Sequence, residues 1–349
     1  MDYNLTVESK PRKTYIAIFA ALAIIGVVAT VSFYPRTPNT AALTQLQIDE
    51  QEFIDYISKY SKQYSEEEYA RRFKIFRDNS AYIRVFNTQG KTWFLGVNEF
   101  ADMTFAEFKS IYTPHQYVQT DESENVHIFE NQAVPTQVDW TLKGAVTPVK
   151  NQGQCGSCWS FATTGPCESA WFLAGHTLTS FSEQQLVDCS SSYGNDGCGG
   201  GTMIGAMKYV IANDGITTEA NYNYTGVTGT CNKAKAKTIA ASFSGYKVVA
   251  ADNIDQMYIA VAQQPVRVEV EADQAAWQMY KGGIVSSDCG TAHDHEVTVV
   301  GYNQINSPPY WKCKNSWGPA WGEAGYIRIA VVAGKGICGI QMQPVYPIV

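Results

Sequence analysis

Hydrophobic and polar positions recur with a helical period through the first third of the chain. One apolar face is formed by Phe53, Tyr56, Ile57 and Tyr60. After Ser65 a longer stripe follows, with members spaced 4, 4, 3, 4 and 4 residues apart: Glu68, Arg72, Phe76, Asn79, Ile83 and Asn87. That spacing keeps the whole stripe on one side of a helix. Ser65 with Glu68, and Thr104 with Glu107, form capping patterns that open two helices.

From Val134 onward the pattern predicts helices first and strands second. The helices are expected over Trp159–Leu173, after the cap formed by Ser182 and Gln185, over Thr202–Asn213 and over Asn253–Gln263. Strict alternation then predicts strands over Val266–Val270, His295–Val299 and Tyr326–Ile329. This order is typical of an α+β protein built in two halves.

The N-terminus carries a candidate membrane segment. Residues 1–14 are polar and end in a basic cluster, whereas residues 15–34 contain no charged side chain. Such a run is long enough to span a bilayer, and the basic cluster would keep residues 1–14 as a cytoplasmic tail. A signal anchor is our first interpretation, and a cleavable signal peptide ending near Ala29 is the alternative. Residues 35–47 form a predicted linker, and either interpretation sends the remainder into the secretory pathway.

Composition narrows the class of protein. The chain has 349 residues, of which 45% are hydrophobic and 17% charged, which suits a globular protein of two or three units. Its net charge is −7 and it has no basic block, which argues against nucleic acid as a partner. All nine cysteines lie between Cys155 and Cys338, which indicates disulfides and an oxidising compartment.

Cys158 is the candidate nucleophile. It stands at the start of the predicted helix over Trp159–Leu173. The unpaired N–H groups and the dipole of a helix N-terminus favour an anion, so we expect the pKa of this thiol to be lowered. A thiolate placed in this way acts as a nucleophile when a base lies beside it.

The base must come from the five histidines. Three of them lie before the change of pattern or just after a helix end: His115, His127 and His176. His293 and His295 remain, and alternation places both on one face of a strand, so it does not choose between them. A metal site built on this His-x-His pair lacks further spaced ligands, so we expect no metal and no other cofactor.

Several motifs, in the propeptide and in the peptidase region, carry a resemblance to a known family. The stripe that begins at Glu68 is similar at every position to the E-R-F-N-I-N signature of cathepsin L-like propeptides. The companion G-x-N-x-F-x-D motif is matched by Gly96, Asn98, Phe100 and Asp102. C-G-S-C-W at Cys158, C-G-x-x-x-D-H-x-V at His295 and N-S-W-G-x-x-W-G-x-x-G-Y from Asn315 resemble the motifs of papain-family cysteine proteases. The resemblance covers residues from about 48 to the C-terminus.

This resemblance implies a domain organisation and an activity. Residues 48–112 would be an inhibitory propeptide, residues 113–133 a segment that spans the cleft and leads to the mature enzyme, and residues 134–349 the peptidase domain. The implied fold is the papain-like α+β fold, a helical half and a β-barrel-like half with the site in the cleft between them. The implied function is that of a cysteine endopeptidase made as a zymogen.

The resemblance also assigns the catalytic roles. Cys158 would form a thioester acyl-enzyme, and His295 would act as general base and acid. Asn315 would orient His295, as the carboxylate does in serine proteases. Gln152 would complete an oxyanion hole with the backbone N–H of Cys158. Trp317 would keep water away from the bond between Asn315 and His295.

The cysteines other than Cys158 allow 105 pairings if all eight are paired. The resemblance selects three: Cys155–Cys198, Cys189–Cys231 and Cys289–Cys338. Cys167 and Cys313 are left as buried free thiols. A glycosylation sequon is present at Asn223, in a segment rich in turn residues.

Alignment with the family also places the substrate subsites. Gly200 and Gly201 would pair with the substrate backbone. The pocket for the second residue before the cut would be lined by Thr202, Met203, Glu269, His293 and Glu296, with Gln343 at its base. Two carboxylates there predict that Arg or Lys is accepted. The alternative is that a cation such as Arg267 or His293 already neutralises them, or that Glu269 faces solvent.

The expected partners are peptide and protein substrates and the chain's own propeptide, with the mature form monomeric. The membrane is a partner if residues 15–34 are not cleaved. A lysosome-like or digestive vacuole, or secretion, is the expected destination. An inactive relative that only binds is the alternative class, but Cys158, His295 and Gln152 are all present. A transferase that uses the same acyl-enzyme with an amine acceptor is a further alternative.

Overall fold

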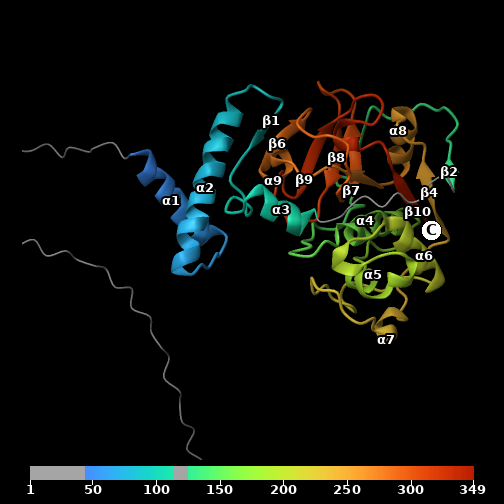
Figure 1. The fold of residues 1–349 in the computed structure, drawn as a ribbon. Coiled ribbons are helices and arrows are strands. Elements are labelled where there is room, and N and C mark those ends of the chain that lie inside the picture. The colour runs from blue at the N-terminus through green and yellow to red at the C-terminus, as the bar shows by residue number, and fades with distance from the viewer. Residues whose placement is uncertain (1–43, 114–124) are drawn as a thin grey trace, which may run out of the picture. The chain divides into compact units, whose positions relative to one another are not determined.

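The computed structural model describes residues 44–113 and 125–349 (Figure 1). The predicted cytoplasmic tail and membrane segment lie outside these ranges, as do residues 114–124 of the predicted cleft-spanning segment. Within the described ranges, no helix combines the length and the apolar character needed to cross a membrane.

The helices are α1 (Gln45–Lys59), α2 (Glu66–Asn87), α3 (Phe105–Tyr112), α4 (Cys158–Leu173), α5 (Glu183–Cys189), α6 (Met203–Ala212), α7 (Lys233–Ala236), α8 (Ile254–Gln263) and α9 (Ala275–Gln278). The strands are β1 (Trp93–Leu95), β2 (Val126–His127), β3 (Gln137–Asp139), β4 (Gly245–Val249), β5 (Val266–Val270), β6 (Tyr280–Val285), β7 (His295–Asn303), β8 (Tyr310–Lys314), β9 (Tyr326–Ala330) and β10 (Val345–Ile348). Short 3-10 turns lie at Ser191–Tyr193, Gly197–Gly199 and Ile337–Gly339.

Two helices of the predicted propeptide, α2 and α3, begin where the capping residues predicted. Thr104 caps α3 in a closed capping box, because its hydroxyl accepts from the Glu107 N–H and the Glu107 carboxylate accepts from the Thr104 N–H. Ser65 caps α2 by accepting from the Glu68 N–H, but the Glu68 side chain does not close the box. It pairs instead with Arg72, 3.2 Å away and one turn further along the helix.

The polar residues of the α2 stripe hydrogen-bond to the loop after β1, which contains the G-x-N-x-F-x-D motif. Arg72 donates to the carbonyl of Asp102 over 2.9 Å. The Asn79 amide donates to the carbonyls of Ala101 and Met103, both at 2.9 Å. The stripe therefore satisfies backbone groups of a loop that has no ladder of its own.

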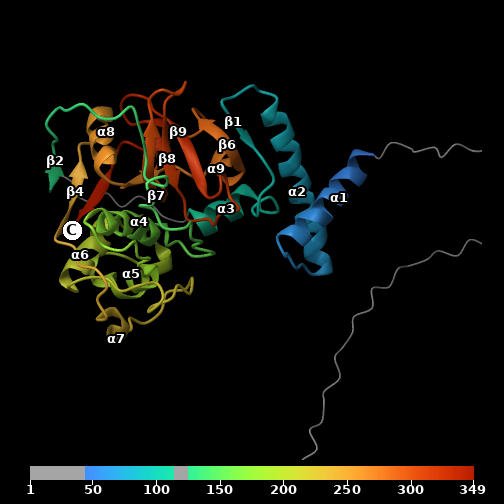
Figure 2. The same cartoon turned by 180° about the vertical axis from the view of Figure 1, so that it is seen from behind.

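The predicted propeptide lies against the predicted peptidase domain through a strand and an aromatic cluster. β1 pairs antiparallel with β6, and the Asn98 amide donates to the carbonyl of Gln278 over 2.7 Å. The rings of Phe100, Phe108 and Tyr112 pack on Trp317 at centroid distances of 5.8, 5.2 and 6.1 Å. Figures 1 and 2 show β1 and α3 beside β6 and α9 from both sides.

The peptidase domain has two buried cores, as the helix-then-strand order predicted. One core lies among helices α4, α5 and α6. The other lies among the strands of the sheet and continues into the propeptide region, where it includes Phe53, Phe76 and Phe108. The strand order is β1-β6-β9-β8-β7-β5-β10-β4-β2, with β3 paired to β7. The prediction for β5 was correct in both bounds, whereas β7 continues to Asn303. Helix α4 packs against β7, which brings the two halves together at the start of both elements.

The predicted disulfides Cys155–Cys198, Cys189–Cys231 and Cys289–Cys338 are present. Cys167 and Cys313 are free and buried, as expected.

Candidate active site

Cys158 is the first residue of α4 and has no exposed surface. Backbone groups of Glu296 and Trp159 hydrogen-bond to its sulfur, which places the thiol beside the start of β7. Burial, followed by the negative charge of Glu296, raises the pKa of the Cys158 thiol well above its usual range. The expected lowering is therefore not found in this form of the chain, because desolvation outweighs the helix end. A sulfur with no exposed surface also cannot meet a substrate.

His295 and Asn315 form a hydrogen-bonded pair inside the molecule. His295 opens β7 and Asn315 directly follows β8, and these two strands are antiparallel neighbours. The distance from His295 Nε2 to Asn315 Oδ1 is 2.8 Å. Trp317 is fully buried and its ring lies 4.6 Å from the imidazole, with 29° between the ring planes. These three residues lie together as the sequence predicted.

The structure separates the two candidate histidines. His293 precedes β7, and its ring nitrogens lie 3.0 Å from the Glu269 carboxylate and 3.0 Å from the Gly339 carbonyl. His295 is the histidine that reaches Asn315. Alternation left open which of the two histidines is the base, and the contact with Asn315 favours His295.

Gln152 is fully buried and takes part in four hydrogen bonds, one of which its carbonyl accepts from the Tyr224 hydroxyl over 2.8 Å. Its backbone N–H donates to the Ser316 carbonyl over 2.8 Å, and its side-chain oxygen accepts from the Ser316 hydroxyl over 2.6 Å. Its amide nitrogen donates to the carbonyl of Cys155 over 3.0 Å. Because the side-chain oxygen is held by Ser316, the N–H₂ group is directed toward the loop that leads to Cys158.

Both positions of the glycine pair in the predicted substrate strand require glycine, Gly200 for its backbone conformation and Gly201 for lack of space. Gly200 has φ 128°, in the region that other residues rarely adopt. A Cβ on Gly201 would lie 2.7 Å from the ring of Trp159. Thr202 caps α6 by accepting from the Gly205 N–H over 3.1 Å, and Met203 is fully buried.

The acidic subsite residues have a cation between them. Arg267 donates to the Glu296 carboxylate over 2.6 Å, contacts the Glu269 carboxylate, and donates to the Gln343 carbonyl over 3.2 Å. The exposed fractions of Arg267, Glu269 and Glu296 are 1%, 2% and 1%. The prediction that Arg or Lys is accepted assumed carboxylates without a partner cation. Because the carboxylates do have a partner cation, the reason for expecting Arg or Lys in this subsite no longer holds. The alternative, in which Arg267 or His293 neutralises the two glutamates, agrees with these contacts.

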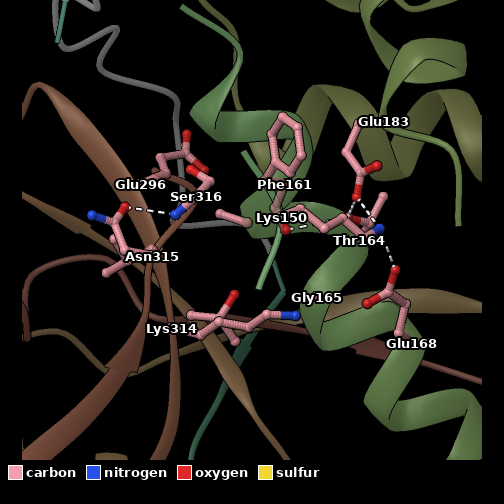
Figure 3. Close-up of a pocket in the computed structure, with 13 residues that line it drawn as sticks. Lys150, Phe161, Thr164, Gly165, Glu168, Glu183, Glu296, Lys314, Asn315 and Ser316 are labelled. Atoms are coloured by element: carbon pink, nitrogen blue, oxygen red, sulfur yellow. Dashed lines mark hydrogen bonds and ion pairs between the residues drawn. The ribbon is translucent and has the colours of Figure 1, made fainter. Parts of the chain in front are cut away.

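A buried ionic cluster behind Asn315 was not predicted. Figure 3 shows Lys150 between Glu168 and Glu183, at distances of 2.8 and 2.5 Å. Lys314 faces the same cavity of ≈ 20 Å³, which lies between α4 and the strands β7 and β8. Burial lowers the pKa of Lys314 to about 8. The available sequence signal was Glu168, an acid inside the otherwise apolar helix over Trp159–Leu173.

Two family models match the chain. Residues 134–348 match the papain family cysteine protease model, and residues 53–108 match the cathepsin propeptide inhibitor domain. Together they cover the peptidase domain and most of the propeptide.

Relatives and solved structures agree with these matches. The senescence-specific cysteine protease SAG39 of Oryza sativa subsp. japonica is 41% identical over 303 residues, which is 84% of this chain and 88% of the relative. A recombinant stem bromelain precursor superposes with a TM-score of 0.80 at 39% identity, over 86% of this chain and 99% of its own. Digestive procathepsin L 3 of the Tenebrio molitor larval midgut gives a TM-score of 0.79 at 35% identity, over 86% and 99%.

Proposed function

Because the chain belongs to the papain family of cysteine proteases and is made with an inhibitory propeptide, we propose that it is an endopeptidase with Cys158 as nucleophile. His295 serves as general base and acid, Asn315 orients it, and Gln152 contributes to the oxyanion hole. The observation that carries this proposal is the 2.8 Å contact between His295 and Asn315, beside the ring of Trp317. The next residue of β7, Glu296, has a backbone group hydrogen-bonded to the Cys158 sulfur.

The proposed reaction has two halves. The Cys158 thiolate attacks the peptide carbonyl carbon, the C–N bond breaks, and His295 gives its proton to the leaving amine. Water then attacks the thioester, with His295 as base, and the carboxylate product leaves. Since Nε2 of His295 faces Asn315, the other ring nitrogen exchanges protons with the sulfur. The Gln152 side-chain N–H and the Cys158 backbone N–H stabilise the oxyanion in both halves.

Latency follows from the propeptide. We assign residues 48–112 to the inhibitory domain, residues 113–133 to the segment through the cleft and the linker, and the cut to a point near Val134. The burial of Cys158 supports this assignment. In acid, protonated carboxylates of the propeptide, among them Asp102 and Glu68, would lose their ionic partners and the inhibitory domain would loosen.

The route and the subsites complete the proposal. Disulfides support passage through the secretory pathway, toward a lysosome-like or digestive vacuole or to secretion, with residues 15–34 as the signal anchor or signal peptide. Asn223 is exposed, which suits a glycosylation site. Gly200 and Gly201 remain the proposed backbone contacts of the substrate. The proposed side-chain subsite consists of Thr202, Met203, Glu269, His293, Glu296 and Gln343.

An acid-activation assay tests this function. The precursor and its Cys158→Ala variant are incubated in acid and then assayed with a fluorogenic peptide. We expect activity and a new N-terminus near Val134 from the parent alone. Cys158→Ser should be nearly inactive, because a hydroxyl is far less acidic than a thiol. His293→Ala is the control for the base: if it abolished activity while His295→Ala retained it, the assignment of the base would be wrong.

A further inference from the structure

Both edge strands of the sheet come from the part of the chain that precedes Val134. β1 stands at one end of the strand order and β2 at the other, next to β4. β2 is parallel to β4, with Val126 opposite Val248 and His127 opposite Val249. Figures 1 and 2 show β2 beside β4 and at a distance from α1, α2 and α3. The segment Asn125–Phe129 also lies outside both matched regions, 53–108 and 134–348.

A glutamine of α8 holds the end of this segment. Gln256 accepts from the Phe129 N–H over 2.7 Å and donates to the Phe129 carbonyl over 3.0 Å. These two hydrogen bonds satisfy the backbone N–H and the backbone carbonyl of Phe129, as pairing with a neighbouring strand would. Gln256 is 9% exposed, so the side chain is fixed rather than solvated.

Aromatic packing supplies the apolar part of the contact. Phe129 is 7% exposed, and its ring lies 4.3 Å from the ring of His127 and 6.1 Å from that of Tyr346. The Tyr346 hydroxyl and His127 Nδ1 are 2.6 Å apart. Ile128, between the two, is 65% exposed. The segment therefore binds as an extended strand that presents alternate side chains to the domain.

We propose that the edge of β4, Gln256 and Tyr346 form a second docking site for an extended peptide, here named the clasp, whose occupant is Asn125–Phe129. The occupant of the clasp lies N-terminal to the cut near Val134, a step that rests on the proposed function. The cut therefore does not release this segment. The separated propeptide stays bound at two places, the β1–β6 contact and the clasp.

Two linked contacts hold a ligand much longer than either contact alone. Once one contact is made, the other forms within the complex, and the gain reaches about 10²–10⁴-fold without any new interaction. The clasp thus sets how slowly the cut propeptide leaves. It does so without touching Cys158, His295 or Asn315.

The test measures departure of the propeptide from an enzyme that cannot cut itself. Residues 130–133, all exposed, are replaced by a recognition sequence for an added protease in the full-length Cys158→Ala chain. After cleavage, the dissociation rate of the propeptide at neutral pH is measured by size-exclusion chromatography over time. Phe129→Ala and Gln256→Ala should each raise that rate about 10²-fold, the lower end of the gain expected from linkage.

Matched controls lie on the same two elements. Ile128→Ala removes an exposed neighbour of Phe129, and Gln263→Ala makes the same substitution at an exposed position of α8. Both should leave the rate unchanged. Equal rates for all variants would overturn the proposal. Since Cys158→Ala has no nucleophile, this result is independent of whether the catalytic assignment holds.

A second measurement avoids the clasp variants, in case Gln256→Ala does not fold. A fluorescent peptide of residues 125–131 is added to the acid-matured parent enzyme. It should bind, and the rate of hydrolysis of a small fluorogenic substrate should not change, because the clasp lies outside the catalytic contacts. No binding, or binding that competes with the substrate, would contradict the docking site.

Discussion

The Arg267 guanidinium donates to the Glu296 carboxylate over 2.6 Å, in the place where the family alignment puts the pocket for the second substrate residue. Glu269 contacts the same guanidinium, and His293 contacts Glu269. In this buried network one guanidinium contacts both carboxylates. An incoming cationic side chain would therefore have to compete with Arg267 for them.

The first prediction concerns specificity. The parent enzyme should cleave peptides with Arg or Phe at the second residue before the cut with kcat/KM values within about tenfold of each other, or about 1.4 kcal/mol. Arg267→Ser leaves two carboxylates without this cation, so the Arg-to-Phe ratio should rise by at least about tenfold. The double variant with Glu269→Ala should reverse part of that rise.

The same substitution should reduce stability. Removing one partner of a buried ion pair costs about 3–5 kcal/mol, because the other charge stays buried. Urea unfolding of the Cys158→Ala chain with and without Arg267→Ser measures this cost. An unchanged midpoint together with an unchanged Arg-to-Phe ratio would show that the network is not formed as described.

Another prediction concerns the oxyanion hole. Gln152→Ala should lower kcat by about 10²–10³-fold with little change in KM, because its side-chain N–H acts on charge that develops in the transition state. Its backbone bond to Ser316 is retained in the variant, so the local fold should hold. Asn315→Ala should be milder than Cys158→Ser, since Asn315 orients the base. A KM effect alone for Gln152→Ala would assign that residue to substrate binding.

Helix starts were predictable because their causes are local. Ser182, Thr202 and Asn253 each cap the helix that the sequence pattern placed there, through a side chain that reaches a backbone N–H three residues ahead. The proposed catalytic residues came from motif resemblance, and the fold brings His295 and Asn315 together because β7 and β8 are paired.

The partners of the subsite residues depend on strand register. Arg267 and Glu269 are two residues apart in β5 and therefore lie on the same face of the strand, as the alternation in the sequence indicated. The contact of Arg267 with Glu296 requires the antiparallel pairing of β5 with β7, in which Glu269 lies opposite Glu296. The burial of Cys158 is likewise a result of tertiary packing, which reversed the direction expected for its pKa from the helix end alone.

A further prediction tests how acid releases the propeptide. The buried Asp102 carboxylate accepts from the hydroxyls of Tyr56 and Tyr64, over 2.6 and 2.5 Å, and pairs with Lys62 over 3.1 Å. Asp102→Asn removes the negative charge that these three groups contact. Hydrogen bonds to a charged group contribute about 1.5–3 kcal/mol each, so the variant should activate sooner and at higher pH than the parent. The lag before fluorogenic activity appears, measured from pH 4 to 7, reports this.

The control for that experiment is Asp78→Asn on the same propeptide. Its partner is Lys74, one turn away on an exposed face of α2, where an ion pair contributes little. Its lag should match that of the parent. Identical lags for Asp102→Asn and the parent would place the acid-sensitive contact elsewhere.

The last prediction concerns Asp294, next to His295. Asp294 is 6% exposed and accepts from the N–H groups of Ala272 and Asp273, over 2.7 and 3.2 Å. Burial is the main cause that raises the pKa of Asp294 to about 8, and the charges of Asp273 and Glu271 add to it. An unfolded aspartate has a pKa of about 3.9. Between about pH 4 and 8 the unfolded chain therefore binds fewer protons than the folded chain, so this group makes stability fall as pH rises.

The slope cannot exceed about 1.4 kcal/mol per pH unit for one group, and Asp294→Asn should remove it. We expect the unfolding free energy of the Cys158→Ala chain to fall less between pH 5 and 7 when Asp294→Asn is present. Asp214→Asn, at a side chain that is 84% exposed, should keep the parent's slope. Because Asp294 belongs to the peptidase domain, its effect opposes that of Asp102: acid would loosen the propeptide while it strengthens the domain that must survive maturation. If the unfolding free energy fell equally with pH in the parent and in Asp294→Asn, Asp294 would make no such contribution. The response to acid would then come from the propeptide alone.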